Sequence, residues 1–228
     1  MDMFLKLKNK LKSKKQHLYV TPPEIQFKFG MNFIESIKSK STKDEQLLLL
    51  DFFIDTIKND LQSEFMSHIF FNKQEGLTPL NSLIPHSCYN ANGEYIEIND
   101  KSTKIIKLKS DTVFVRTWVE TRLFDSLKLL AKTPFRYDEY NHFGYYYNFL
   151  DFALIYNGNH SITAGVYYKK GEIELPVCLT EKLFPHVYAT HDSWCNAHND
   201  EIIEEISDFR VSLIYEASKL KYKLKYNI

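Results

Sequence analysis

The chain has 228 residues, of which 44% are hydrophobic and 25% are charged. These values are ordinary for globular proteins, and they exclude a wholly disordered or collagen-like chain. The 29 basic and 29 acidic residues cancel, so any contact with nucleic acid must come from a local basic patch rather than from the whole surface.

The cellular compartment is predicted from cysteine usage and from hydropathy. Cys88, Cys178 and Cys195 form no CxxC pair, which indicates a reducing compartment rather than a disulfide framework. No apolar run approaches the roughly 18 residues that a membrane-spanning helix needs. Lysines interrupt the apolar residues near the N-terminus, so no signal peptide is expected. We therefore expect a cytoplasmic protein without a transmembrane segment.

The first predicted element is a short basic helix at residues 3–16. Phe4, Leu7 and Leu11 recur there at helical spacing among six lysines. Such a helix could contact a membrane surface or nucleic acid. The alternative, which is favoured because charge runs are usually solvated, is an exposed terminal helix.

Two longer helices and a domain boundary follow. Helices are predicted at 25–38 and 45–70, and in the second the apolar residues step by three or four and form a stripe facing the core. Asp44 is expected to cap it. A Pro- and Ser-rich stretch then predicts a boundary between a helical region at 1–75 and an α+β domain at 76–228.

The centre of the chain is predicted to form a small mixed sheet. An Asn-Gly turn at 90–93 separates strand-like segments, and a helix predicted at 118–130 is stopped by Pro134. An apolar strand, a glycine turn, a short helix ending near Tyr168 and another strand then follow in the order of a βαβ-like unit. The expected strands are 94–98, 104–108, 112–116, 152–156 and 172–179.

A long helix is predicted to close the chain. It would run from about Asn196 or Glu201 to Tyr222, with Ile202 and Ile206 at the start of its buried stripe. Helices at both ends and mixed elements between them are typical of an α+β fold.

The sharpest motif is the turn after the 152–156 strand, Asn157-Gly158-Asn159-His160-Ser161. A glycine at a strand-to-helix turn lets the backbone approach a ligand, and the free N–H groups at the helix start attract an anion. His160 could then hydrogen-bond a phosphate or move a proton near neutral pH. The alternative is a tight Asn-Gly turn with a satisfied histidine.

This turn is followed by Ala164-Gly165 and by Leu175-Pro176-Val177. In order and spacing these residues resemble the signature box of the ParB/sulfiredoxin-like superfamily, where a strand ends in a Gly-x-His-Arg turn before a short helix and a Pro-Val strand. The resemblance covers roughly residues 112–180. The same stretch also looks like an uncharacterised family of bacterial proteins.

The resemblance implies a nucleotide or phosphate pocket formed by Gly158, Asn159, His160 and the helix after them. Members of the superfamily bind or hydrolyse nucleotides, and some cleave DNA. Several of them act in chromosome partitioning, plasmid maintenance or phage defence. If phosphoryl chemistry occurs, Mg²⁺ is the expected companion.

One residue of the motif departs from the superfamily pattern. Ser161 stands where the superfamily usually has arginine, and serine replaces neither the charge nor the two-pronged geometry of a guanidinium. Arg116, Arg122 or Arg136 would have to supply that charge from elsewhere in the chain.

His142 is a second catalytic candidate. It lies in a tyrosine-rich loop and could face His160 across the pocket, with Asp138 or Glu139 as its orienting carboxylate. Such a pair would suit general acid–base chemistry or a metal. The alternative, which is preferred, is a surface loop whose tyrosines pack on the sheet.

A zinc site is considered at His191, Cys195 and His198. Their spacing places them on one face only if a single helix contains all three, and Asp192 looks more like the N-cap of that helix, which would leave His191 outside. The spacing matches no standard zinc pattern, so zinc is not expected.

The leading hypothesis is a prokaryotic nucleotide- or phosphate-binding protein that hydrolyses nucleotides or processes DNA, in phage defence or mobile-element maintenance. His160 and His142 would be its catalytic residues, and Asn157, Gly158, Asn159, Ser161, Arg116 and Arg122 would contact the phosphate. The rival hypothesis is a non-catalytic module with a degenerate active site that contacts a protein or DNA partner. Whether the chain is an enzyme stays open at this point.

Overall fold

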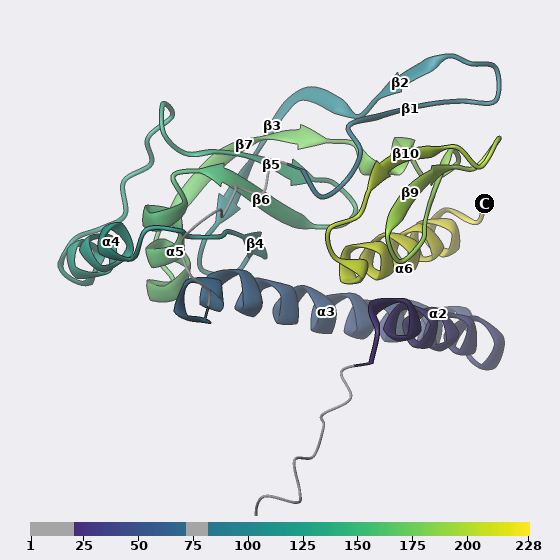
Figure 1. Ribbon diagram of the computed structural model, residues 1–228, viewed down its shortest axis with the longest axis horizontal. Helices are drawn as coiled ribbons and strands as arrows, with labels where there is room; N and C mark the ends of the chain where they lie inside the picture. The colour runs from purple at the N-terminus through teal and green to yellow at the C-terminus, as the bar shows by residue number, and fades with distance from the viewer. Residues whose placement is uncertain (1–20, 72–81) are drawn as a thin grey trace, which may run out of the picture.

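The structure is a computed structural model that describes residues 21–71 and 82–228 (Figure 1). The helix predicted at 3–16 and the boundary predicted between residues 75 and 76 lie outside these residues. Helices lie at both ends of the described chain and mixed strands lie between them, which confirms the α+β fold. None of the helices in the described part is both long and apolar enough to span a bilayer.

The two N-terminal helices form an antiparallel pair, α2 (Pro23–Lys40) and α3 (Lys43–Phe71). Both were predicted, but Asp44 does not cap the second helix. Instead, a carboxylate oxygen of Glu45 accepts hydrogen bonds from the backbone N–H of Thr42 at 2.8 Å and from its hydroxyl at 2.9 Å. These bonds are the glutamate half of a capping box, and α3 begins one residue before Asp44.

A five-stranded mixed sheet lies at the centre of the molecule. The order across it is β3-β7-β5-β6-β4, with parallel pairing only in β4/β6 and β5/β7. The predicted order of strand, glycine turn, helix and strand is confirmed, but β6 and β7 run in opposite directions with β5 between them. The predicted βαβ-like unit therefore does not connect two parallel strands through its helix. The strands are β3 (Asn99–Lys107), β4 (Val113–Phe114), β5 (Phe143–Tyr147), β6 (Phe152–Asn157) and β7 (Glu172–Cys178).

Helices cover the sheet on both faces. On one face, Ile162 of α5 (Asn159–Tyr168) packs on Ile155 of β6, and α4 (Glu120–Lys132) packs beside α5. On the other face, the ring of Phe65 in α3 meets that of Phe114 edge-on, with centroids 5.5 Å apart. Because both faces are covered, β6 is a continuous apolar run rather than an alternating one.

The start predicted for the C-terminal helix is wrong. The first part of that segment forms β10 (Ile202–Glu205), which belongs to a three-stranded sheet with β9 (Ser193–Asn196) and β8 (Val187–Ala189). Ile202 pairs with β9 and is 67% exposed instead of facing the core. The helix α6 (Phe209–Tyr226) starts only where a side chain can cap it.

Asp208 is that cap, because its carboxylate accepts the backbone N–H of Arg210 at 2.9 Å. The Arg210 guanidinium also pairs with Asp208, and it reaches Asp60 at 2.6 Å and Glu64 at 2.5 Å on α3. This network fixes the start of α6 against α3.

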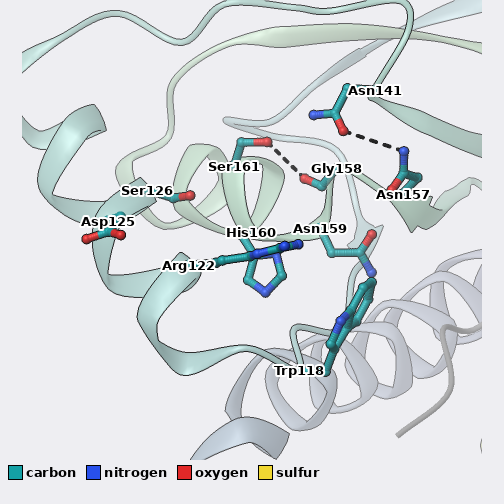
Figure 2. Close-up of a pocket in the computed structure, with 10 residues that line it drawn as sticks. All are labelled: Trp118, Arg122, Asp125, Ser126, Asn141, Asn157, Gly158, Asn159, His160 and Ser161. Atoms are coloured by element: carbon teal, nitrogen blue, oxygen red, sulfur yellow. Dashed lines mark hydrogen bonds between the residues drawn. The ribbon is translucent and has the colours of Figure 1, made fainter.

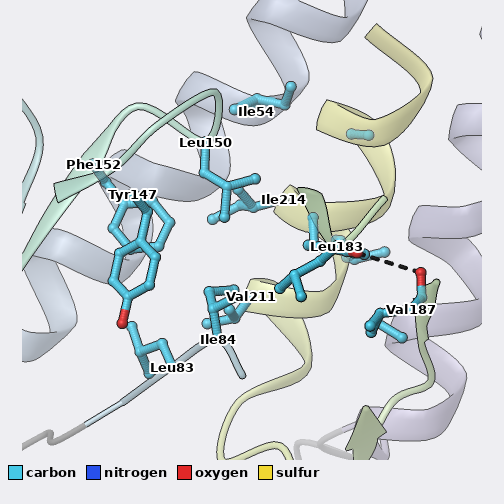
Figure 3. Packing of buried hydrophobic residues seen from close by; sticks show 14 of the residues in the cluster. Ile54, Leu83, Ile84, Tyr147, Leu150, Phe152, Leu183, Val187, Val211 and Ile214 are labelled. Atoms are coloured by element: carbon cyan, nitrogen blue, oxygen red, sulfur yellow. Dashed lines mark hydrogen bonds between the residues drawn. The ribbon is translucent and has the colours of Figure 1, made fainter. Parts of the chain in front are cut away.

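The main core lies between the sheet and α6. Figure 3 shows Tyr147 and Phe152 from the central sheet packed with residues of the segment after residue 82 and with Ile214 of α6. A short 3-10 helix, η1 (Thr180–Lys182), precedes the buried Leu183. A separate hairpin, β1 (Ser87–Tyr89) and β2 (Tyr95–Glu97), turns at the predicted Asn-Gly pair.

Candidate functional site

The candidate site lies at the carboxyl ends of β4 and β6, which are parallel neighbours. Ligands of open α/β sheets commonly bind in the crevice just outside such strand ends. A pocket of about 410 Å³ opens here between the start of α5, the first turns of α4 and the loop before β5 (Figure 2). Its lining residues are Trp118, Arg122, Asp125, Ser126, Asn141, Asn157, Gly158, Asn159, His160 and Ser161.

Gly158 makes the turn from β6 into α5. Its φ of 76° and ψ of 16° lie in the left-handed region, where residues with a Cβ are strained. A Cβ at this position would also collide with the ring of His142 and would lie 3.0 Å from the carbonyl oxygen of Asn141. The turn thus requires glycine for two independent reasons.

The start of α5 presents backbone donors to the pocket. The first N–H groups of a helix have no acceptors within it, and the first such bond here runs from Ile162 N–H to the Gly158 carbonyl oxygen at 3.1 Å. The first turn carries no acidic residue that would offset the positive end of the helix dipole. This end therefore favours an anion.

Asn159 lines the pocket, and its side-chain amide nitrogen holds the start of α5 in place. Its side chain is 1% exposed, and its Nδ2 donates to the carbonyl oxygen of Arg116 at 2.7 Å. That bond connects the helix to the chain just after β4. Of the predicted phosphate contacts, Asn159 is therefore best understood as a positioning residue.

His160 is held as a hydrogen-bond donor. Its Nε2 accepts the backbone N–H of Val119 at 3.2 Å, so in the neutral ring the proton is on Nδ1. Burial, and then the nearby positive charge of Arg122, lower the pKa of His160 and favour that neutral form. The ring also meets Trp118 edge-on, with centroids 5.4 Å apart. In this arrangement His160 can donate to a phosphate oxygen through Nδ1, but it has no free lone pair for a base.

His142 does not face His160 as an acid–base partner. It is 4% exposed, and its Nδ1 accepts the backbone N–H of Asp138 at 3.1 Å. Its Nε2 therefore carries the proton and donates to Ser161 Oγ at 2.9 Å. Ser161 Oγ in turn donates to the Gly158 carbonyl oxygen at 2.9 Å.

These hydrogen bonds of His142 and Ser161 differ from those of a catalytic Ser–His pair. In such a pair the histidine must accept the serine proton, with Nδ1–H held by a carboxylate. Here the Nε2 of His142 is the donor, and burial lowers the pKa of His142 and favours its neutral form. His142 and Ser161 therefore hold the Gly158 turn through two consecutive hydrogen bonds, an arrangement that we call the clasp.

Arg122 is the cation that faces the pocket. It lies on the exposed surface of α4, and it makes no ion pair or hydrogen bond with the residues that the structure describes. Figure 2 shows its side chain beside the ring of His160. Asp125, one turn further along α4, is the one carboxylate among the described lining residues. Arg122 is thus available for an anion at the start of α5.

Arg116, in contrast, does not line the pocket. Its guanidinium lies 5.1 Å from the centre of the Phe65 ring, on the side of the sheet that α3 covers. Burial lowers the pKa of Arg116, although the negative charges of Glu64 and Asp208 partly offset this effect. We therefore assign Arg116 to packing rather than to ligand contact.

The rim of the pocket contains the predicted Asn157 together with residues that the sequence analysis did not single out. Asn157 Nδ2 and Asn141 Oδ1 lie 3.5 Å apart across its opening (Figure 2). Asp125 and Ser126 were missed, although they follow Arg122 at the i+3 and i+4 spacing that places residues on one helix face. That spacing was the available signal.

The residues considered for zinc are not brought together. Cys195 is buried in β9, His191 lies in the preceding turn beside Asp192, and the Nε2 of His198 lies 2.9 Å from the Nδ1 of His186. No helix contains them, so the one-face argument fails. Among the residues with described positions, no group of three His, Cys, Asp or Glu side chains could hold a metal ion.

Comparison with known proteins places the chain in a family. A family model described as a family of unknown function, DUF6710, matches residues 4–228. The chain belongs to this family, which agrees with the expected membership of an uncharacterised family. No curated protein and no solved structure matches the chain.

Proposed function

We propose that the chain binds a phosphate-bearing ligand of the nucleotide class at the start of α5. One observation carries the proposal: the guanidinium of Arg122, which has no ion pair within residues 21–71 and 82–228, and the free N–H groups of α5 converge on the same pocket. His160 Nδ1–H adds a third donor. Phosphate oxygens are the acceptors that such a set of charged and backbone donors recognises.

The resemblance to the ParB/sulfiredoxin-like superfamily supports the same proposal. Ser161 stands at the position of the usual arginine, and its hydroxyl is already bound by Gly158 and His142. Arg122 reaches the pocket from α4 instead and offers the missing charge. On this view the site keeps its phosphate function with the arginine supplied by a different element.

The arrangement favours binding over hydrolysis. Both histidines have their lone pairs engaged by backbone N–H groups, so neither can act as general base without giving up that bond. The proposal is therefore closer to a ligand-binding or interaction module than to a nucleotide hydrolase or a DNA-processing enzyme. A role in phage defence or mobile-element maintenance would rest on ligand sensing.

Mg²⁺ fits the pocket as a companion of the ligand rather than as a resident ion. Magnesium is commonly held by one or two carboxylates together with substrate phosphates, and Asp125 supplies one carboxylate at the lining. A bound Mg²⁺ would neutralise part of the phosphate charge. Asp125 would then face the metal, while Arg122 and the α5 N–H groups would face phosphate oxygens.

The test is a titration of the full chain with ADP, ATP, GDP and GTP, with and without Mg²⁺, followed by isothermal calorimetry. Arg122→Gln should weaken binding of any nucleotide about tenfold or more, because charge-assisted hydrogen bonds are worth about 1.5–3 kcal/mol. Lys128→Gln is the matched control, since it removes a charge from the same helix outside the pocket lining. Absence of binding by the wild type, or equal affinity in both variants, would overturn the proposal.

A further inference from the structure

A second pocket adjoins the first along α4. It has a volume of about 370 Å³ and is lined by Leu129, Leu130, Thr133, Pro134, Phe135, Arg136 and Ser161. Ser161 also lines the phosphate pocket, so the two pockets meet at this residue. Neither the sequence motif nor the proposed phosphate site accounts for this second pocket.

The residues of α4 that line the two pockets change from charged and polar to apolar along the helix. Arg122, Asp125 and Ser126 face the first pocket, and Leu129 and Leu130, one turn further on, face the second. All five lie at helical spacings of three or four and so share one face of the helix. A ligand lying along this face would meet charge at one end and apolar surface at the other.

Phe135 forms one wall of the second pocket, and its ring is held by contacts with His142 and Gly171. The ring of Phe135 stacks on His142 with centroids 5.2 Å apart and an interplanar angle of 24°. On another side it packs so closely on Gly171 that a Cβ at Gly171 would collide with it. The same His142 donates to Ser161, so one buried imidazole holds both the apolar wall and the turn of the phosphate site.

Few hydrogen-bonding groups remain free in the second pocket. The hydroxyl of Thr133 donates to the Leu129 carbonyl oxygen at 2.9 Å, and Ser161 Oγ has both of its bonds inside the clasp. Arg136 remains, exposed and without an ion pair or hydrogen bond in the part of the chain that the structure describes. A guanidinium can lie flat on an aromatic ring.

We infer that the second pocket holds the base of the nucleotide whose phosphate lies at the start of α5. This inference rests on the proposed function and adds to it the part of the ligand beyond the phosphate. A flat aromatic base matches a pocket of apolar walls with one guanidinium at its edge. Because no amide or carboxylate faces this pocket among the described lining residues, different purines should bind with similar affinity.

The experiment compares AMP, GMP and ribose 5-phosphate by calorimetry on the full chain. Ribose 5-phosphate has the same phosphate and sugar but no base. AMP and GMP should each bind about tenfold more tightly, since stacking of a base is worth about 1–3 kcal/mol. Leu129→Asn should remove this difference and leave the affinity for ribose 5-phosphate unchanged.

Phe124→Asn is the matched control. Phe124 is 42% exposed and Leu129 is 59% exposed on the same helix, but Phe124 lines neither pocket. Both variants replace an exposed apolar side chain, so both should fold. The control should keep the full preference for a base.

The outcomes separate the two proposals. If nucleotides and ribose 5-phosphate bind equally to the wild type, the base pocket is overturned while the phosphate site stands. If a base preference exists but survives Leu129→Asn, the base lies elsewhere and the inference is again overturned. If none of the three ligands binds, the base pocket is overturned, and the proposed function fails with it unless the nucleoside di- and triphosphates bind in the first titration.

Discussion

Replacing Gly158 by alanine should lower the free energy of unfolding by more than the backbone strain of a left-handed residue alone would. Forcing a residue with a Cβ into the left-handed region costs about 1–2 kcal/mol. The collision with the ring of His142 adds an overpacking penalty of about 1–3 kcal/mol, since that ring is buried and stacked on Phe135. Gly158→Ala should therefore lower the free energy of unfolding by about 3 kcal/mol.

Gly93 provides a matched control for the backbone contribution. Its φ of 77° is nearly the same as that of Gly158, but, its two chain neighbours aside, a Cβ there would have no atom of the described residues within 4 Å. Gly93→Ala should lower the free energy of unfolding by about 1 kcal/mol, from strain alone. The difference between the two variants therefore isolates the contact between Gly158 and His142.

The assay is guanidinium chloride unfolding followed by far-ultraviolet circular dichroism at pH 7.5. If both variants lose the same free energy, His142 does not pack against the Gly158 turn, and the clasp through Ser161 is refuted. The double variant Gly158→Ala with His142→Ala separates the steric part further, because removing the ring should relieve part of the loss. A fully additive double variant would also contradict the contact.

Three further predictions concern the same clasp and the core contacts. First, burial keeps the pKa of His142 below its usual value of 6.5. The unfolded chain therefore binds the proton more readily, and the free energy of unfolding should fall as the pH drops below 6.5. His142→Gln should reduce that dependence without abolishing it, because burial also lowers the pKa of His160; pH-dependent unfolding curves measure the change, with the surface variant His191→Gln as the control for replacing a histidine. Second, Ser161→Ala should lower the free energy of unfolding by about 1–3 kcal/mol, because it leaves a buried N–H without an acceptor, and unfolding curves equal to the wild type would exclude the bond. Third, Arg210→Ala should cost about 2 kcal/mol by breaking three charged contacts, whereas the exposed Arg136→Ala should cost less than about 0.5 kcal/mol; equal melting temperatures would contradict this difference.

The elements that the sequence predicted correctly carry strong local signals. The apolar stripe of α3, the proline after α4 and the glycine turn before α5 are each set by residues close in sequence. Helical spacing misled the prediction at Ile202, where the neighbouring strand pairs with the backbone instead. Apolar residues spaced three or four apart are typical of a helix, but such a segment can still form a strand when a partner strand lies alongside.

The sequence predicted the backbone turn of the candidate site and several of its lining residues, but not the contacts that two of the predicted side chains make. The Gly158 turn and the helix after it follow from the local sequence. The roles of His142 and Arg116 depend instead on segments distant in sequence, namely the Asp138 backbone and the Phe65 ring. No local pattern reveals which nitrogen of a histidine is engaged by a remote backbone N–H group.

The start of α5 is fixed from two directions before any ligand binds. Asn159 and His160 bond to the backbone just after β4, at Arg116 and Val119, and Ser161 bonds to His142 on the other side. A site whose donors are already held in place loses little conformational entropy when a ligand arrives. Arg122, on the exposed face of α4, is the one pocket cation in the described structure that still has to be ordered. Affinity should therefore depend strongly on that single side chain, whereas substitutions in the clasp should act mainly through stability.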